Sequence, residues 1–185
     1  MKSSPDRPSG LIRLLASATC LVACLLAVHP LAANNVPREA PELTLKSVDG
    51  NTVTLDSLKG KVVAVLWIST DCPHCQTTCE ELAPIYEKYA GRGLEIMGMA
   101  VNPNAPGNIG RFKRDHGVRF PIGVSSRSDW MRFADLSVMA RAYVPFMMLV
   151  DRKGVIRYEH KGMDGEFWSD MGTNFLREMS TLLAE

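Results

Sequence analysis

Excess charge of either sign is nearly absent from this sequence: 21 lysines and arginines face 20 aspartates and glutamates, so the formal net charge is +1. Without a basic excess, the chain lacks the electrostatic signature of a nucleic-acid-binding protein. It also lacks internal repeats, low-complexity tracts and a linker that would divide it. Its 185 residues, 46% of them hydrophobic, therefore predict a single globular domain with its own core and no nucleic-acid partner.

Metal ligands are scarce as well. The chain has four histidines and five cysteines, and three of the cysteines crowd into the stretch "TDCPHCQTTCE" at residues 70–80. No second cluster of cysteine and histidine accompanies them, and we therefore expect no metal. Copper(I) or zinc stays open as an alternative, because soft thiolates favour both ions. The ligands would be Cys72, His74, Cys75 and Cys79.

The N-terminus carries a long apolar segment. A basic start is followed by an apolar run from Leu14 to Val28 and by small residues at Ala32 and Ala33. This order is typical of a secretory signal. We predict that residues 1–33 are a signal peptide and that residues 34–185 form an exported domain, in the periplasm or another extracytoplasmic space.

Two other interpretations of this segment stay open. The run from Leu11 to Ala33 is long enough to span a bilayer, which takes about 20 apolar residues, so it could instead be a membrane tether. The stretch "LVAC" at residues 21–24 resembles the lipobox of bacterial lipoproteins, with Cys24 as the acylated residue. Either alternative would also place the domain outside the cytoplasm.

The cysteine count changes when the predicted signal is set aside. Cys20 and Cys24 lie within it, which leaves Cys72, Cys75 and Cys79 in the domain. An odd number leaves at least one thiol unpaired in an exported protein. A C-x-x-C pair in that environment persists as a disulfide unless something reduces it.

Strand and helix patterns alternate along the domain. "KVVAVLWIS" at 61–69 is a nearly continuous apolar run, which suits a strand buried on both faces of a sheet. Apolar residues at every third or fourth position mark a helix from Pro73 to about Ala90, with Pro84 expected to kink it and Gly91 to end it. The other predicted elements are a hairpin at 43–55, strands at 94–102, 144–151 and 155–160, and helices ending at Gly117 and spanning 129–142 and 166–184.

This alternation predicts an α/β fold, in which helices flank a central mixed β-sheet. The hairpin around Asp49-Gly50 precedes the first buried strand, so we expect it to form an N-terminal extension of the sheet domain.

The motif Cys72-Pro73-His74-Cys75 follows a buried strand and opens a helix. Cys72 would lie at the helix N-terminus, where free backbone N–H groups and the helix dipole stabilise a thiolate. Pro73 suits the first turn. Cys75, one turn further on, would be shielded and near enough to close a disulfide. The pattern predicts thiol–disulfide exchange, in which Cys72 attacks and Cys75 resolves the mixed disulfide.

His74 and Cys79 have less certain roles. A histidine beside the attacking cysteine can donate to the thiolate or lend it positive charge, which favours the dithiol and makes the disulfide more oxidising; the alternative is an exposed histidine with no role. Cys79 lies on the same helical face as Cys75 and is expected to be a small buried hydrophobic residue. A disulfide between these two would have poor geometry.

The order of these elements resembles the thioredoxin fold. "LTLKSVDGNTVTLDSLKGKVVAVLWIS" and "VPFMMLVDRKGVI" are similar to the exported TlpA/ResA-like thiol–disulfide oxidoreductases and the neighbouring redoxin (AhpC/TSA) proteins, over roughly residues 40–160. The resemblance implies that Pro145 is a cis proline beside the disulfide and that the backbone of Val144 pairs with the substrate.

It also implies the partners. These would be protein clients with thiols or disulfides, with apocytochrome c before haem attachment as one common client, and a membrane electron donor or acceptor. No organic cofactor is needed, because the Cys72–Cys75 dithiol carries the two electrons itself.

Several residues depart from the family pattern. Asp71 replaces the tryptophan that usually precedes the first cysteine, and its charge should oppose a thiolate on Cys72. Leu66 stands where thioredoxins have a buried aspartate, and Glu80 where many relatives have the helix-kinking proline. A CPHC motif with valine before the cis proline is similar to strongly oxidising DsbA-type enzymes, so the direction of electron flow stays open.

A peroxidase remains an alternative function. Peroxiredoxins carry a P-x-x-x-T-x-x-C signature before the reactive cysteine. Counting back from Cys72, Ser69 could replace the threonine, but Val65 stands where the proline should be.

Overall fold

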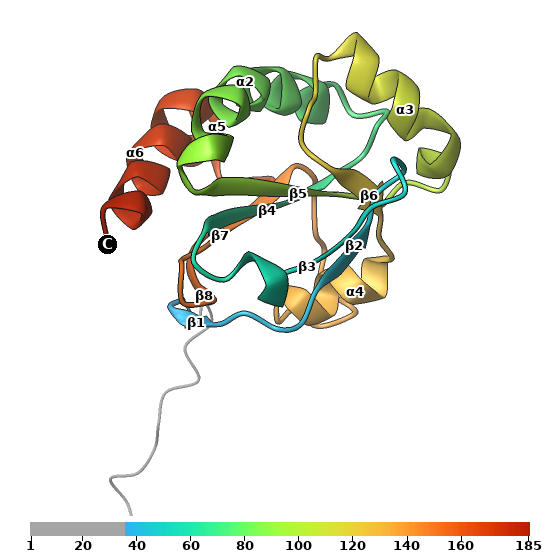
Figure 1. Cartoon of the computed structure of the whole chain (residues 1–185). Helices are drawn as coiled ribbons and strands as arrows, with labels where there is room; N and C mark the ends of the chain where they lie inside the picture. The colour runs from blue at the N-terminus through green and yellow to red at the C-terminus, as the bar shows by residue number, and fades with distance from the viewer. Residues whose placement is uncertain (1–35) are drawn as a thin grey trace, which may run out of the picture. The chain divides into compact units, whose positions relative to one another are not determined.

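The computed structural model describes residues 36–185. The predicted signal, tether or lipobox at residues 1–33 lies outside them. Helices and strands follow in the order shown in Figure 1: β1 (Arg38–Glu39), β2 (Thr44–Lys46), β3 (Thr52–Thr54), η1 (Asp56–Leu58), β4 (Val62–Ile68), α2 (Pro73–Tyr89), η2 (Ala90–Arg92), β5 (Leu94–Ala100), α3 (Ala105–Asp115), β6 (Ile122–Val124), α4 (Arg127–Phe133), β7 (Phe146–Val150), β8 (Val155–His160), α5 (Gly165–Trp168) and α6 (Met171–Ala184).

The predicted mixed sheet is confirmed. Six strands lie in the order β1-β8-β7-β4-β5-β6. The pairs β4·β5 and β5·β6 are parallel, whereas β7 is antiparallel to both β4 and β8. None of the helices within residues 36–185 is both long and apolar enough to cross a membrane.

Strand β4 lies at the centre of the domain, and all seven of its side chains are buried. Successive side chains of a strand point to opposite faces of the sheet. Val62, Ala64, Leu66 and Ile68 accordingly join the core cluster beneath α2, α3 and α6, and Val63, Val65 and Trp67 join the cluster that includes α4. In Figure 1, α2 and α6 cover one face of the sheet and α4 the other.

The predicted N-terminal hairpin is also present. Strands β2 and β3 pair antiparallel as a separate two-stranded sheet. Gly50 in the connecting turn has a φ of +86°, which a glycine adopts without strain. The hairpin rests on the edge of the main sheet through a bridge between Ser47 and Gly123.

Three details of the predicted helices are wrong, although the ends predicted near Ala90 and at Ala184 are confirmed. Helix α2 passes into a 3₁₀ turn, and the residue with positive φ that ends the segment is Gly93 rather than Gly91. The helix predicted at 129–142 ends at Phe133, because Asp135 takes a φ of +52° and turns the chain away. The segment predicted as one helix at 166–184 is split into α5 and α6 by Ser169 and Asp170, and Asp170 has non-helical backbone angles (φ −146°, ψ 62°).

A substitution at Gly123 tests how closely the hairpin packs on the sheet. A Cβ atom added there would overlap the backbone carbonyl of Lys46, which cannot rotate away. We expect Gly123→Ala to lower the free energy of unfolding by about 1–3 kcal/mol, as overpacking usually does. Gly107→Ala is the matched control, because an added Cβ meets nothing within 4 Å. Denaturant titration of both variants decides, and equal unfolding midpoints would contradict this packing.

Candidate thiol site

Cys72 lies at the junction between the sheet and α2. It is the N-cap residue of the helix, with extended backbone angles (φ −92°, ψ 117°), and Pro73 occupies the first turn. Its backbone N–H donates to the carbonyl of Ser69 (3.2 Å), and its carbonyl accepts from the N–H of Gln76 (3.0 Å). The half-buried thiol thus lies at the helix N-terminus, as the sequence predicts.

Cys75 lies one turn further along α2 and is fully buried. Burial raises the pKa of its thiol well above the ordinary value. The backbone N–H of Ser69 donates to its Sγ (3.5 Å) and partly offsets this effect, whereas the adjoining Cys72 thiol raises the pKa of Cys75 further. The two thiols are therefore in contact but differ in accessibility.

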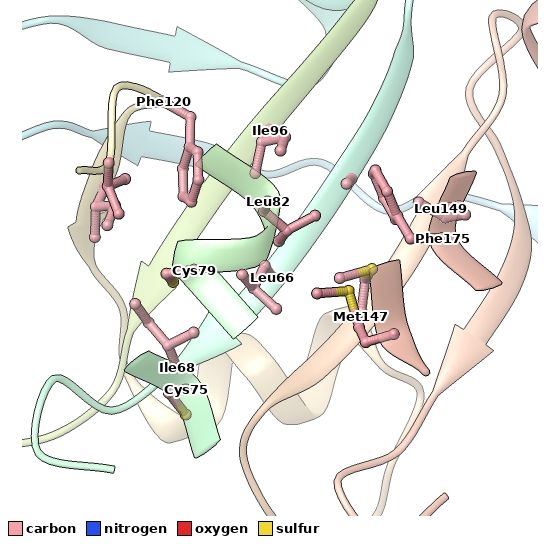
Figure 2. Packing of buried hydrophobic residues seen from close by; sticks show 14 of the residues in the cluster. Leu66, Ile68, Cys75, Cys79, Leu82, Ile96, Phe120, Met147, Leu149 and Phe175 are labelled. Atoms are coloured by element: carbon pink, nitrogen blue, oxygen red, sulfur yellow. The ribbon is translucent and has the colours of Figure 1, made fainter. Parts of the chain in front are cut away.

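Cys79 is fully buried among apolar side chains on the same helical face. Figure 2 shows its side chain close to those of Leu66 and Ile68, which belong to the same buried cluster. Burial raises the pKa of Cys79 as well, so its thiol stays protonated at neutral pH. These surroundings agree with the expected packing role.

His74 is exposed, and its ring makes no hydrogen bond with another residue in the part of the chain that the structure describes. Its backbone carbonyl accepts from the Thr78 hydroxyl (2.8 Å). The ring therefore does not donate to either thiol in this conformation. Its remaining route to influence Cys72 is charge acting through solvent.

The segment before β7 adopts the geometry that the family resemblance implies. The Val144-Pro145 peptide bond is cis. Pro145 is buried, and Val144 packs against the same apolar cluster as Cys72. Gly162 lies against this segment so closely that an added Cβ would come within 2.5 Å of the Tyr143 carbonyl oxygen.

A hydrogen-bond network before Cys72 was missed in the sequence. The Asn102 side chain accepts from the backbone N–H of Thr70 (3.0 Å) and donates to the Thr70 hydroxyl (2.8 Å). The Gln76 side chain donates to the Thr70 carbonyl (3.2 Å), and the Asn104 side chain donates to Asp71 Oδ2 (2.8 Å). Two loops and the first turn of α2 are thus joined.

The available signal for this network was the position of Asn102 at the end of the strand predicted at 94–102. Strands β4 and β5 are parallel and end in register at Ile68 and Ala100. Their carboxyl ends therefore meet at one edge of the sheet, where the Thr70 and Asn102 loops lie side by side.

The metal alternative finds no support in the arrangement. Within residues 36–185, no group of three or more His, Cys, Asp or Glu side chains is placed to hold a metal ion. The cysteines at 75 and 79 point into the core while His74 is exposed, so the four candidate ligands do not converge.

Comparison with known proteins identifies the family of this chain. Residues 36–159 match the AhpC/TSA family. The chain belongs to this family. The thiol–disulfide oxidoreductase ResA of Halalkalibacterium halodurans is 33% identical over 85 residues, which are 45% of this chain and 47% of that protein. Phospholipid hydroperoxide glutathione peroxidase 1 of Arabidopsis thaliana is 32% identical over 82 residues, 43% of this chain and 35% of that protein.

Solved structures confirm the thioredoxin fold. The thiol:disulfide interchange protein of Chlorobium tepidum TLS, a thioredoxin family protein, superposes with a TM-score of 0.66 at 22% identity, over 82% of this chain and 99% of that one. A thiol:disulfide interchange protein from Bacteroides sp. gives 0.62 at 19% identity, over 80% and 93%. The curated relatives that are 32–36% identical to this chain are matched over only about a third to a half of their own length. The predicted thioredoxin fold, the AhpC/TSA family and the likeness to ResA are confirmed.

The burial of Cys75 and Cys79 predicts selective labelling. In the reduced full chain at pH 7, we expect iodoacetamide to modify Cys72 at least about a hundredfold faster than either buried cysteine, because burial raises the pKa of Cys75 and Cys79 and hides both sulfurs from the reagent. Peptide mass spectrometry resolves each cysteine separately. Comparable rates at Cys72 and Cys75 would contradict the buried position of Cys75.

Proposed function

We propose that this protein is an exported thiol–disulfide oxidoreductase that exchanges the Cys72–Cys75 disulfide with protein clients. The observation that carries the proposal is the asymmetry of the pair: Cys72 lies accessible at the N-terminus of α2, and Cys75 is buried in contact with it. Relatives named thiol–disulfide oxidoreductase support the same activity.

The reducing reaction takes two steps. The Cys72 thiolate attacks a client disulfide, forms a mixed disulfide and releases one client sulfur as a thiolate. The Cys75 thiol then loses its proton and attacks Sγ of Cys72, which forms the internal disulfide and releases the second client thiolate. The two electrons of the dithiol thus pass to the client, and the oxidising direction is the reverse.

The second step needs a base for the Cys75 proton. Leu66 is apolar and fully buried, so it supplies none. The client thiolate released in the first step is a base already at the site. The Ser69 N–H, which donates to Cys75 Sγ, stabilises the thiolate as it forms.

The client would bind beside Val144 and Pro145. Val144 packs against the same apolar cluster as Cys72. Tyr143 precedes this segment and is exposed, and exposed Met163 follows Gly162, which lies against the Tyr143 carbonyl. We infer that the Val144 backbone pairs with the client chain, that a membrane protein supplies or accepts electrons, and that apocytochrome c is one candidate client.

A thiol peroxidase is the second candidate, favoured by the relatives named glutathione peroxidase. It is distinguished by consumption of peroxide by the reduced chain, with a sulfenic acid on Cys72. The Ser69 hydroxyl accepts from the Asp71 N–H (3.3 Å) within its own turn, which leaves its O–H able to donate to a peroxide oxygen.

Cysteine variants test the oxidoreductase proposal. We expect Cys72→Ser to reduce disulfide turnover to background, and Cys75→Ser to trap a mixed disulfide, because the first step is kept and the second is lost. Cys79→Ala is the matched control and should retain turnover within about twofold, since a volume change at a buried site leaves the thiol pair intact. Loss of turnover in Cys79→Ala with the fold retained would contradict these roles.

The exposed position of His74 limits its effect on the couple. Since an exposed charge is worth about 1 kcal/mol or less, we expect His74→Ala to make the reduction potential more negative by no more than about 30 mV. Equilibration with glutathione measures it. Lys88→Ala, at the far end of α2, is the control for loss of a positive charge. A shift well beyond this range would mean that His74 contacts the thiolate directly.

A further inference from the structure

Asp71 places a carboxylate directly before the attacking cysteine. A negative charge beside Cys72 opposes thiolate formation. The start of α2 makes this problem sharper: its N-cap has no side-chain hydrogen bond, and its first turn contains no acidic residue. The positive end of the helix is thus left to the Cys72 thiolate, but a mobile carboxylate one residue away would be attracted to the same place.

The structure holds this carboxylate elsewhere. Asp71 Oδ2 accepts from Asn104 Nδ2 (2.8 Å) and, more weakly, from Asn102 Nδ2 (3.4 Å). Its Oδ1 accepts from the Thr70 hydroxyl at 3.5 Å. Both asparagines belong to the β5–α3 loop, so the carboxylate is turned toward that loop. Hydrogen bonds to a charged group are about twice as strong as neutral ones, which makes the arrangement favourable.

Asn104 is the N-cap residue of α3, yet its side chain makes no capping hydrogen bond to that helix. An asparagine at an N-cap ordinarily accepts from a backbone N–H of the first turn. Here its Nδ2 donates to Asp71, and its Oδ1 accepts from Asn102. The side chain therefore serves the contact with the Cys72 loop rather than its own helix.

Asn102 holds the residue before Asp71 in place. It is half-buried, and both polar atoms of its side chain bond Thr70, which precedes Asp71. Thr70 is itself buried and held from the other side by Gln76. The loop before Cys72 is thus anchored through Thr70, and Asn104 adds a hydrogen bond to Asp71.

We propose that Asn104, supported by Asn102, is a positioning residue that keeps the Asp71 carboxylate on the β5–α3 loop and away from the Cys72 thiolate at the start of α2. The inference deepens the proposed function, because it names what lets Cys72 ionise despite the adjacent aspartate. Asn104 is exposed and caps nothing, so its loss leaves the core and α3 intact.

The test is the pH profile of Cys72 alkylation in the reduced full chain, read by peptide mass spectrometry. We expect Asn104→Ala to move the profile to higher pH, so that the rate on its rising part falls about threefold, the effect of a charge interaction of roughly half a pH unit. The rate on the alkaline plateau stays unchanged. Asn108→Ala, on the next turn of α3, is the matched control and should leave the whole profile in place.

Repeating the Asn104→Ala substitution in an Asp71→Asn background tests whether the Asp71 charge causes the shift of the pH profile. In Asp71→Asn, which removes the charge, Asn104→Ala should have no effect on the profile, because a double-mutant cycle isolates the pairwise interaction. An unchanged profile in Asn104→Ala, an equal shift in the Asp71→Asn background, or a loss on the plateau would each overturn the proposal. Alkylation measures only how readily Cys72 forms a thiolate, whereas disulfide turnover of the unaltered chain measures the proposed oxidoreductase function. The positioning role of Asn104 and the oxidoreductase function can therefore fail independently.

Discussion

The thiol site depends on the burial of β4 on both faces. Its alternating side chains fill two separate cores, and hydrogen bonds to β5 and β7 hold it on both edges. A slip by one residue would exchange the faces and place Trp67 beneath α2, so the register is strongly fixed. The chain therefore leaves the sheet at one point, Ile68, and Cys72 begins α2 four residues later. The position of the reactive thiol follows from the packing of a strand that has no part in the chemistry.

One helical turn then separates two chemically different thiols. Cys72 lies at the start of α2, where the helix dipole and unpaired N–H groups face outward. Cys75 points into the core, where burial raises its pKa and hides it from a client. This difference is the basis for our proposal that Cys72 attacks and Cys75 resolves.

Features that depend on local pattern could be predicted from the sequence. The apolar run of β4, the Asp49-Gly50 turn and the helix opened by Pro73 each carry their signal within a few residues. Helix ends were less predictable, because the choice between Gly91 and Gly93 depends on how the chain enters β5. The contacts of Asn102 and Asn104 join segments more than 30 residues apart, so they follow only from the parallel register of β4 and β5.

Two departures from the family pattern become connected in the structure. A carboxylate at position 66 would lie in the apolar cluster beneath α2, where an unpaired charge is costly. The chain has leucine there and carries its carboxylate at Asp71, which is exposed and bonded by side-chain amides. Water and amide donors reduce the effect of this charge on Cys72 far more than a dry core would. An exposed aspartate is therefore compatible with a reactive thiolate, provided that the β5–α3 loop holds it.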